Sequence, residues 1–557
     1  MRVPDERLSL TYSRTHRIRA DGGRRLDGAD ADGTAVPGSL IVVSNRQPYR
    51  HEYDDADDGG DGRTEPPTEA PESDRPDPDE RSITVDEPTG GLTAGLDPVL
   101  REQRGTWIAW GDGDADFDVT DDSGCVAVPP EDEAYTLGRV DLSEAAVDGY
   151  YYGFSNRVLW PLCHELPHLV DDRPTDLEWY RRVNERFADA VIDHADADSV
   201  VWFQDYHFAF APKLVSEATP RSTTVAQFWH IPWPTPSIFA ACPARDQLLT
   251  GLLGADLLGF HVDRYVTNFL ESVDRFVPAA TVDYRQRTVE YDGSKTQVVA
   301  TPMGVDADSY DREARSAKTD QNPVLEDHDV ASETVLGLGV DRLDYSKGIL
   351  DRLVALERFF ERNPAWQGEF TFVQKATPSR TDIPAYERYG KLVREEVERI
   401  NDRFETDDWQ PIVYTEAYLE HETLCGLYRR ADVMIVSPLL DGMNLVTQEY
   451  VAASVDGTGT VVLSDQAGAH DHLGSHALSI DPTDVEETAT QIERALTMAP
   501  HERHRRLQTL RTRVFEADLE QWMESQFEWI RRVQTRNRST VSRPDTDNDS
   551  RERTPPI

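Results

Sequence analysis

Short, nearly continuous apolar runs alternate along this chain with segments of helical periodicity. Seven of the runs are rich in β-branched residues, and they lie at 40–43, 199–203, 224–228, 334–338, 370–373, 433–436 and 460–463. Runs of this kind are typical of strands that are buried on both faces, as in a parallel sheet. Residues 349–360 carry apolar side chains at helical spacing, and this stripe ends near Asn363-Pro364. The alternation predicts an α/β fold built on parallel sheets.

A polar segment at 310–332 separates the first three runs from the last four. We therefore predict two Rossmann-like domains that face a central cleft. In sheets of this type, ligands bind beyond the carboxyl ends of the strands. Functional side chains are then expected directly after the apolar runs.

The chain is acidic and poor in lysine. Its 557 residues include 103 Asp and Glu against 58 Lys and Arg, a formal net charge of −45, and only six of the basic residues are lysines. A nucleic-acid partner and an anionic membrane surface are disfavoured, because both need a basic face. The composition is typical of adaptation to high salt, where self-repulsion is screened. Polar composition predicts disorder in three segments, 1–38, 52–80 and 536–557.

The four cysteines, Cys125, Cys163, Cys242 and Cys425, lie far apart in the sequence. None forms a CxxC pair, so neither a disulfide framework nor a structural zinc site is expected, and reduced thiols in the cytoplasm are the default. No apolar stretch approaches the roughly 18 residues of a membrane span. The N-terminus lacks the apolar core of a signal peptide.

Two motifs match well-known signatures in the wrong context. Residues 30–34 read DxDGT, as in a phosphatase nucleophile loop, but no buried strand precedes them. Residues 164–168 read HExxH, a zinc-peptidase signature that needs both His on one helical face. Pro167 lies inside that turn and would clash with the preceding turn of a helix. We predict neither activity.

Candidate anion-binding groups follow two of the strands. The first run ends in Ser44-Asn45-Arg46, and a Gly90-Gly91 pair, which allows close backbone approach to a ligand, comes later. In the second half, Arg342 and Lys347 lie five residues apart just before a helix. Two cations at a helix N-terminus favour a diphosphate. The site is not a P-loop, because GxxxxGK[ST] is absent.

Aromatic and polar residues are candidate sugar contacts. Aromatic groups at 107–110 and 150–160 can pack on sugar rings, although each group alone is better explained as core. The segments 204–207 and 229–236 directly follow two buried runs. After the run 433–436, Asp441 lies in a Gly-containing loop and Glu449 lies about one turn into the next helix. The loop acid can hold sugar hydroxyls and the helix acid a ribose diol.

Taken in order, these motifs match one family. They are SNR (44–46), GGL (90–92), YYxGFSNxxLWP (150–161), DYH (205–207), HIPWPTP (230–236), DLLGFH (256–261), DRLDYSKG (341–348), TPSR (377–380), DGMNLV (441–446) and SDQAGA (464–469). Together they resemble the trehalose-6-phosphate synthases, retaining glycosyltransferases of family 20 with the GT-B fold. The similarity covers about residues 39–530.

The resemblance implies transfer of glucose from a nucleotide-glucose, usually UDP-glucose, to glucose 6-phosphate, giving α,α-trehalose 6-phosphate. It implies an acceptor domain at 39–325, a nucleotide-sugar domain at 326–485, and helices at 486–535 that pack back on the N-terminal domain. On the acceptor side it implies Arg46, Trp110, Tyr151, Trp160, Asp205 and Arg380. On the donor side it implies Gly90, Gly91, His230, Arg342, Lys347, Leu419, Asp441, Gly442, Met443, Asn444, Leu445, Val446 and Glu449.

The sequence departs from the family at two positions. Leu419 lies where the family usually carries a Phe on the nucleobase side, which leaves the preferred base open. Gln204 replaces a common His before the DYH motif.

The implied mechanism is substitution on one face of the sugar with retained configuration. The implied catalytic residues are Arg342, Lys347, Asp205 and His230, with the two cations stabilising the developing diphosphate charge. No cofactor and no metal are expected. The expected partners are the two substrates and a separate trehalose-phosphate phosphatase, with a homo-oligomer left open. The rival readings are a glucosylglycerol-phosphate synthase, which uses glycerol 3-phosphate as acceptor, and a non-catalytic sensor of sugar phosphates.

Overall fold

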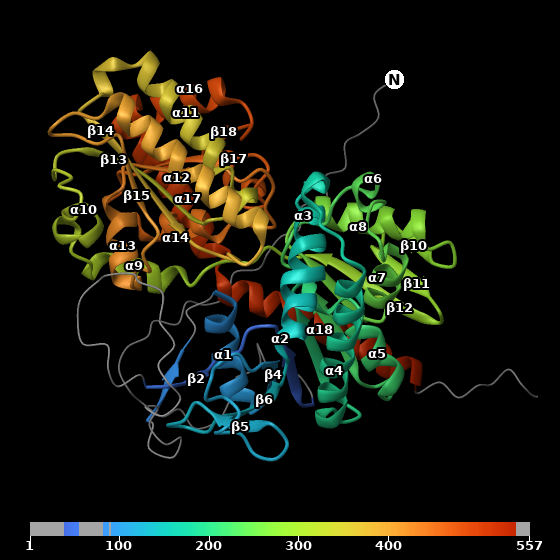
Figure 1. Cartoon of the computed structure of the whole chain (residues 1–557). Helices are drawn as coiled ribbons and strands as arrows, with labels where there is room; N and C mark the ends of the chain where they lie inside the picture. Colours follow the sequence, from blue (N-terminus) through green and yellow to red (C-terminus); the bar gives the residue numbers. More distant parts are fainter. Residues whose placement is uncertain (1–37, 55–81, 88–90, 542–557) are drawn as a thin grey trace, which may run out of the picture.

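The computed structural model describes residues 38–54, 82–87 and 91–541. Figure 1 shows two α/β domains, one from each half of the chain, each built around a sheet. The DxDGT motif, Gly90 and most of the three segments predicted to be disordered lie outside the described residues. Within the described part of the chain, no helix has the length and apolar character needed to cross a membrane.

The first domain is built on a ten-stranded sheet in the order β10-β11-β12-β9-β8-β7-β1-β4-β6-β5. The seven inner strands of this order, β12, β9, β8, β7, β1, β4 and β6, run parallel to one another. Antiparallel strands close the two edges, β10 and β11 at one edge and β5 at the other. The bounds are β1 Leu40–Val43, β4 Thr106–Trp110, β5 Cys125–Val128, β6 Tyr135–Val140, β7 Val200–Gln204, β8 Thr224–Phe228, β9 Leu257–Phe260, β10 Thr281–Asp283, β11 Thr288–Tyr291 and β12 Ser294–Ala300.

The second domain is built on a six-stranded parallel sheet in the order β15-β14-β13-β16-β17-β18. The chain moves outward from β13 in one direction and then returns to β16 on its other side, so the switch point lies between these two strands. The bounds are β13 Val335–Arg342, β14 Phe370–Thr377, β15 Ile412–Thr415, β16 Val433–Val436, β17 Thr460–Ser464 and β18 Leu478–Ile480.

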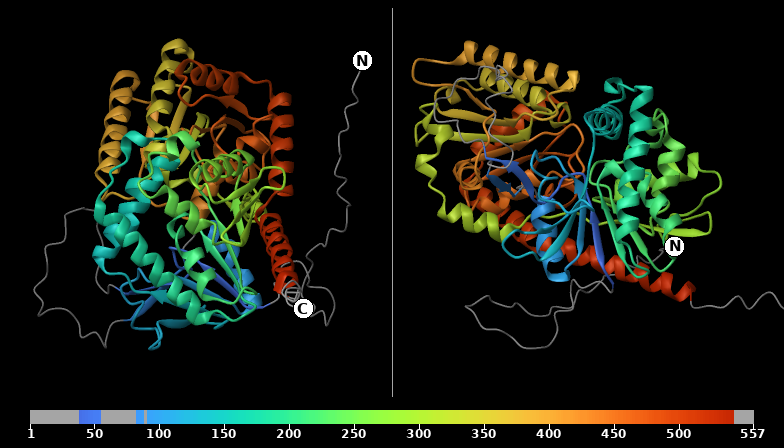
Figure 2. Two further views of the ribbon diagram at one scale, coloured as in Figure 1. Left: turned by 90° about the vertical axis from the view of Figure 1, so that its right-hand side faces the viewer. Right: turned by 60° about the horizontal axis from the view of Figure 1, so that its bottom comes forward.

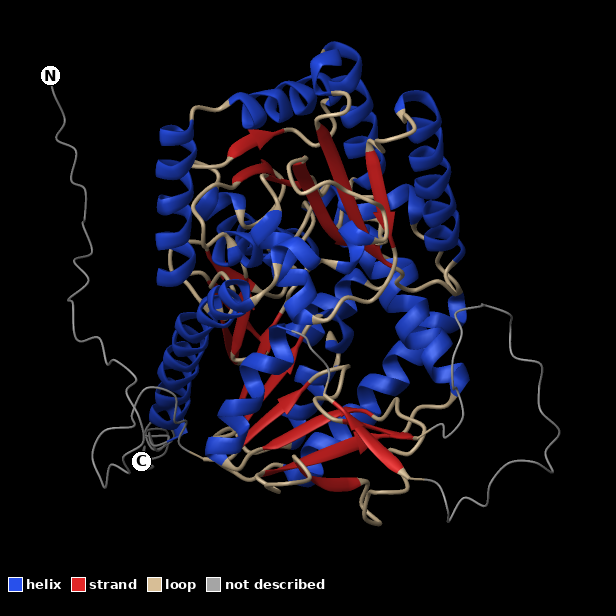
Figure 3. Ribbon diagram, turned by 90° about the vertical axis from the view of Figure 1, so that its left-hand side faces the viewer, coloured by secondary structure: helices blue, strands red, loops and turns tan. Residues whose placement is uncertain are grey.

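Helices cover both faces of each sheet (Figure 3). In the first domain they are α1 Gly91–Gln103, α2 Glu144–Val147, α3 Trp160–Cys163, α4 Pro174–His194, α5 Ala211–Ala218, α6 Pro236–Phe239, α7 Arg245–Leu252 and α8 Asp263–Phe276. In the remainder of the chain they are α9 Ala307–Ser316, α10 Pro323–Glu326, α11 Ile349–Arg362, α12 Pro384–Phe404, α13 His421–Arg430, α14 Leu445–Ala453, α15 His470–Leu473, α16 Val485–Thr497, α17 Pro500–Glu516 and α18 Leu519–Val541.

All seven predicted strand runs are strands, namely β1, β7, β8, β13, β14, β16 and β17, which confirms the α/β fold with parallel sheets. The predicted helical stripe is α11, which begins after Gly348 and ends before Asn363-Pro364. Gly348 has φ +63°, and a side chain there would collide with the Ser437 carbonyl, so glycine is required where the helix begins.

The C-terminal helices divide between the domains. α16 and α17 pack on the second domain, against α11 and α14 respectively, and α18 crosses to the first sheet (Figure 2). There Trp522 packs against Trp202, with ring centroids 5.8 Å apart. Of the segment 486–535, predicted to pack back on the N-terminal domain, the part in α18 lies against the first sheet and the part in α16 and α17 lies on the second domain.

Two predicted disordered segments begin later than expected. Glu52 and Tyr53 belong to β2 (Arg50–Tyr53), which pairs with β3 (Ile83–Asp86). At the C-terminus, α18 continues to Val541. Arg536 explains part of this extension, because it donates a hydrogen bond to the Lys295 carbonyl at 2.7 Å and so ties the helix to the first sheet.

Candidate active site

Polar side chains from the two domains meet beyond the carboxyl ends of the strands. Trp160, at the start of α3, donates its indole N–H to Asp344 Oδ1 over 3.4 Å. Arg380, in the loop after β14, donates to the hydroxyl of Tyr206, which follows β7, over 3.3 Å. Trp160 and Tyr206 belong to the first domain and Asp344 and Arg380 to the second, so these contacts join the two domains at one place.

Asp344 is the buried anion at the centre of this contact. It is fully buried and accepts hydrogen bonds from the backbone N–H and the hydroxyl of Ser346, each at 2.9 Å. Its other oxygen accepts from Arg380 Nη1 at 3.3 Å. Burial alone would raise the pKa of this carboxyl, but the charges of Arg380, Arg342 and Lys347 hold the pKa below its usual range. The sequence predicted no role for Asp344, because an Asp before a helical turn is an ordinary N-cap residue.

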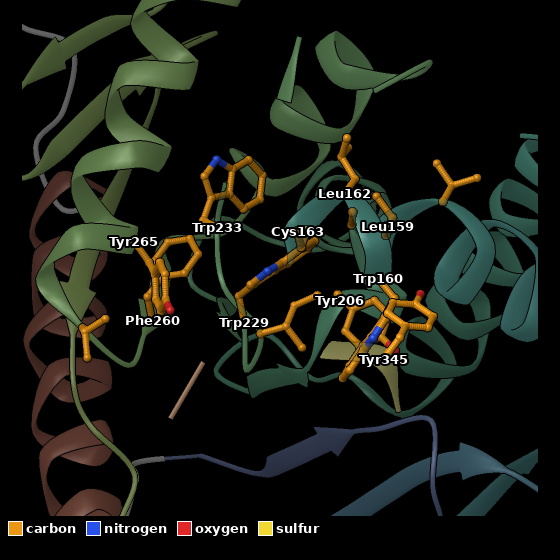
Figure 4. Close-up of a cluster of buried hydrophobic side chains, with 14 of the residues drawn as sticks. Leu159, Trp160, Leu162, Cys163, Tyr206, Trp229, Trp233, Phe260, Tyr265 and Tyr345 are labelled. Atoms are coloured by element: carbon orange, nitrogen blue, oxygen red, sulfur yellow. The ribbon is translucent and has the colours of Figure 1, made fainter. Parts of the chain in front are cut away.

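Two predicted site cations lie near the same aromatic ring. The guanidinium carbons of Arg380 and Arg342 lie 4.0 Å and 5.1 Å from the ring centroid of Trp160. Cations are attracted to the face of an indole. Figure 4 shows Trp160 beside Tyr206 of its own domain and Tyr345 of the other. One residue predicted for the acceptor and one predicted for the donor are therefore neighbours.

Tyr151 marks the centre of a positively charged region. Its ring lies 6.2 Å from that of Trp110. Burial raises the pKa of the Tyr151 phenol, but the charges of Arg380, Arg46 and Arg342 outweigh burial and bring the pKa below its usual value. All three guanidinium groups are thus near enough to influence the Tyr151 phenol. We call Arg46, Arg342 and Arg380 the arginine cluster.

Asp205 faces this cluster in a strained backbone conformation. Its φ of 73° and ψ of −179° fall in a region that is almost restricted to glycine and costs on the order of 1–3 kcal/mol. Burial raises the pKa of its carboxyl to about 6, against the opposing charges of the arginine cluster. Strain of this kind persists where the surroundings hold a side chain in a working position. The structure thus brings together all six residues predicted for the acceptor: Arg46, Trp110, Tyr151, Trp160, Asp205 and Arg380.

His207 belongs to the segment 204–207 that was a candidate for sugar contacts, although the resemblance assigned it no role. Its ring stacks between those of Tyr206 and Tyr151, with centroids 4.2 Å and 5.8 Å away. Both ring nitrogens are buried without a hydrogen-bond partner, as is Nε of Arg380. Burial and the charges of Arg380 and Arg46 lower the pKa of the imidazole, which keeps it neutral. Unpaired buried donors and acceptors beside the arginine cluster fit a polar, anionic ligand. The DYH motif was the available signal for this residue.

On the donor side, Lys347 and Asp441 form an ion pair 94 residues apart in sequence. Lys347 Nζ lies 2.6 Å from Asp441 Oδ2, and Asn444 Nδ2 donates to the same oxygen over 3.3 Å. Burial alone would raise the pKa of Asp441, but Lys347 lowers it to about 2, so the carboxylate stays ionised. The two predicted donor residues are thus held together by charge.

The loop after β16 passes directly over His230 of the other domain. A side chain at Gly442 would collide with the carbonyl oxygen of His230, so only glycine fits at this crossing. The His230 Nε2 atom lies 3.0 Å from Oε1 of Gln204 at the end of β7. Gln204, one of the two residues that depart from the family, thus contacts a predicted catalytic residue. Its Nε2 is buried and unpaired.

Helix α8 of the first domain holds the same loop from a second side. Tyr265 donates its hydroxyl to the Asp441 carbonyl at 2.7 Å, and Arg264 donates at 2.7 Å to the carbonyl of Gln466, which lies in the adjacent loop after β17 and accepts from the Asp441 N–H. Within the loop, Met443 is buried, and the loop ends where Leu445 and Val446 begin α14. The backbone of the predicted donor loop is therefore fixed by both domains.

Glu449 lies one turn into α14, as its spacing predicted, and away from the arginine cluster. Its Oε2 accepts from the Tyr428 hydroxyl at 2.7 Å, and a second hydrogen bond comes from Tyr310. Burial raises the pKa of this carboxyl. Leu419 is half-buried and packs at the edge of the apolar cluster that contains Tyr428. Gly91 opens α1.

The HExxH segment is not arranged as a zinc site. α3 ends at Cys163, and Pro167 begins a separate short turn, so His164 and His168 do not share a helical face. Among the described residues, no group of three or more His, Cys, Asp or Glu is placed to hold a metal ion. As expected from Pro167, the segment between the two His is not one continuous helix.

Known proteins of one family resemble this chain. The sequence model of glycosyltransferase family 20 matches residues 65–532. A trehalose-6-phosphate synthase of Mycolicibacterium gilvum is 37% identical over 446 residues, covering 78% of this chain and 87% of that protein. A bifunctional trehalose-6-phosphate synthase/phosphatase of Thermoproteus tenax is 35% identical over 449 residues. That match covers 78% of this chain but 57% of the relative, so the chain spans little more than half of that protein.

Solved structures show the same architecture. The trehalose-6-phosphate enzyme of E. coli bound with UDP-2-fluoro glucose superposes with a TM-score of 0.74 at 30% identity, covering 89% of this chain and 99% of that one. A UDP-forming trehalose-phosphate synthase of Burkholderia xenovorans in complex with glucose 6-phosphate gives 0.73 at 30% identity, covering 89% and 100%. The two-domain GT-B fold predicted from the sequence is confirmed.

Proposed function

The chain belongs to glycosyltransferase family 20, and we propose that it transfers glucose from UDP-glucose to glucose 6-phosphate with retention of configuration. The products would be α,α-trehalose 6-phosphate and UDP. The observation that carries this proposal is the arginine cluster, which lies with Lys347 where the two domains meet in a chain of net charge −45. So strongly acidic a protein gathers four cations at one place when its ligands are anions.

The acceptor phosphate fits the arginine cluster. Arg380 presents an unpaired Nε, and His207 beside it presents two unpaired ring nitrogens. Asp205, Tyr151 and Trp160 supply a carboxylate, a phenol and an aromatic face for the sugar. The Burkholderia relative binds glucose 6-phosphate, which supports this acceptor.

Arg342 and Lys347 would bind the donor diphosphate. During transfer the bond from the anomeric carbon to the diphosphate oxygen breaks, and its electron pair goes to that oxygen. The acceptor hydroxyl oxygen bonds to the anomeric carbon from the same face, and its proton passes to the leaving diphosphate. Preorganised cations stabilise the charge that develops on the leaving group, which is the main source of rate enhancement in this arrangement.

We also propose that the reaction needs no metal, because side-chain cations already supply the charge that the diphosphate requires.

The cytosol is the proposed location, since all four cysteines are free thiols. A separate phosphatase that removes phosphate from the product, and a homo-oligomeric state, remain proposals. Adaptation to high salt is supported by the acidic, lysine-poor composition.

The proposed activity is tested by a matrix of donors and acceptors. UDP-, ADP- and GDP-glucose are each assayed with glucose 6-phosphate and with glycerol 3-phosphate, at low and molar salt, with and without EDTA. We expect turnover with UDP-glucose and glucose 6-phosphate, unchanged by EDTA. Turnover with glycerol 3-phosphate alone would establish a glucosylglycerol-phosphate synthase. Tight binding of both substrates without turnover would establish a sensor.

The raised pKa of Asp205 predicts a pH dependence. Its carboxyl is ionised above about pH 6 and protonated below, and only the ionised form is a pure hydrogen-bond acceptor for sugar hydroxyls. The acceptor phosphate titrates in the same range, so wild type is compared with Asp205→Asn at each pH. We expect the ratio of their kcat/KM values to exceed about tenfold at pH 8 and to fall toward one near pH 5. A ratio independent of pH would contradict a role for the ionised carboxylate.

A further inference from the structure

Lys375 in β14 is a buried cation that the proposed mechanism does not use. It is one of six lysines in the chain and is 8% exposed. Its ammonium group contacts the hydroxyl of Thr377, which lies further toward the carboxyl end of the strand. Within the described residues it has no carboxylate partner, and burial alone lowers the pKa of its ammonium group. In a chain with 103 acidic residues, an unpaired buried lysine needs an explanation.

The strand register places Lys375 on the donor side of the sheet. Lys375 pairs with Val340 of β13 and with Thr415 of β15. Side chains on one strand alternate between faces, and paired residues on neighbouring strands share a face. Lys375 therefore shares the face of Arg342, which lies two residues beyond Val340. The apolar cluster on this face includes Val340 and has three predicted donor residues at its edge, Leu419, Leu445 and Val446.

Lys375 is separate from the cations that would bind phosphate. The carboxyl of Asp344 responds to the charges of Arg380, Arg342 and Lys347 as its main ionic influences. Lys375 responds to no charged group. It lies on the strand next to β13, about 5 Å across the sheet, at the level of Val340 and therefore two residues before the level of Arg342. On its other side is β15, whose following loop carries Leu419.

The parts of a nucleotide sugar can be laid along this face. Arg342 and Lys347 mark the diphosphate, and Glu449 on α14 marks the ribose. The part left for the region between Arg342 and Leu419 is the nucleobase. A buried ammonium group with one hydroxyl partner is costly, and the cost is offset when a ligand supplies an acceptor.

We propose that Lys375 donates a hydrogen bond to a ring carbonyl oxygen of the donor nucleobase and thereby selects uracil over adenine. Uracil, like thymine, presents the O4 carbonyl as an acceptor, whereas adenine presents an amino donor at the corresponding edge. A lysine can only donate, so adenine would leave two donors facing each other. This inference rests on the proposed function and extends it to the choice of base.

The test compares Lys375→Met and Lys375→Gln with wild type, using UDP-glucose and ADP-glucose. We expect Lys375→Met to lower kcat/KM for UDP-glucose about 10- to 100-fold, mainly through KM, as for the loss of a hydrogen bond to a charged group. Activity with ADP-glucose should stay within about twofold, and the KM for glucose 6-phosphate should not change. Lys375→Gln keeps a neutral donor and should be intermediate. Lys391→Met, at an exposed lysine on α12, is the matched control.

An unchanged ratio of UDP-glucose to ADP-glucose activity in Lys375→Met would overturn the inference. If that variant does not fold, calorimetric binding of UDP and ADP to Lys375→Gln gives the same comparison, and an unchanged ratio of affinities would overturn it equally. Absence of transfer by wild type would instead contradict the proposed function.

Discussion

Replacing Arg342 and Lys347 together by alanine is expected to abolish glucosyl transfer. Each single replacement should lower kcat by about 10²- to 10³-fold, the usual loss when one preorganised group facing a developing negative charge is removed. The reason is position as well as charge. Arg342 ends β13 beside the Trp160 ring, and Lys347 ends the turn that precedes α11, so both are fixed before substrate arrives.

The Lys347→Ala result must be separated from the loss of the ion pair with Asp441. Without Lys347, a carboxylate that is ionised in the wild type is left buried and unpaired, which is itself destabilising. Lys347→Met combined with Asp441→Asn removes both charges, so a stable but inactive double variant would show that the loss of activity does not come from misfolding.

Lys391→Ala is the matched control for these measurements, because its side chain is exposed and pairs only with Glu395 one turn along α12. Release of UDP, followed in a coupled assay, gives kcat and KM for each variant. Full activity in the Arg342→Ala, Lys347→Ala double variant would contradict the proposed mechanism.

The strands that the sequence predicted are buried on both faces, although two other interior strands, β4 and β9, were not predicted. β1, β7, β8, β13, β14, β16 and β17 are the continuous apolar runs, and their composition alone distinguishes them from loops. The edge strands were not predicted, because strands such as β5 and β10 carry polar or exposed residues and are stabilised by antiparallel neighbours. Their pairing is a tertiary property that local composition does not encode.

The candidate site shows a similar division. The positions of Arg342 and Lys347 before α11 and of Glu449 one turn into α14 are local features of the sequence, so they were predicted. The pairing of Lys347 with Asp441 joins the segments that follow two different strands, β13 and β16, and the indole of Trp160 reaches Asp344 across the domain boundary. Neither contact has a local pattern. Asp344 was missed for this reason, although it lies inside a motif that the sequence displays.

The second large effect is expected at Asp344. Asp344→Asn replaces one carboxylate oxygen with an N–H₂ group. If the new N–H₂ group faces Arg380 Nη1 and the Tyr386 hydroxyl, these two hydrogen-bond donors are left without the oxygen that accepted from them. Arg380 then loses its carboxylate partner and keeps the hydroxyls of Tyr206 and Tyr386 as hydrogen-bond acceptors. The extra net positive charge would favour phosphate binding in general, but an arginine out of position cannot form the directed contacts that a phosphate needs.

We therefore expect Asp344→Asn to raise the KM for glucose 6-phosphate about 10-fold or more and to lower kcat/KM about 10²- to 10³-fold, since loss of one partner of a buried charge pair costs about 3–5 kcal/mol. The matched control is Asp341→Asn. Asp341 is also buried and pairs with Arg352 at 2.6 Å, but it contacts no acceptor residue. Both variants should lower Tm by similar amounts, whereas only Asp344→Asn should change the KM for the acceptor. Equal kinetic effects in the two variants would show that Asp344 serves folding alone, and the buried carboxylate would then have no part in placing Arg380.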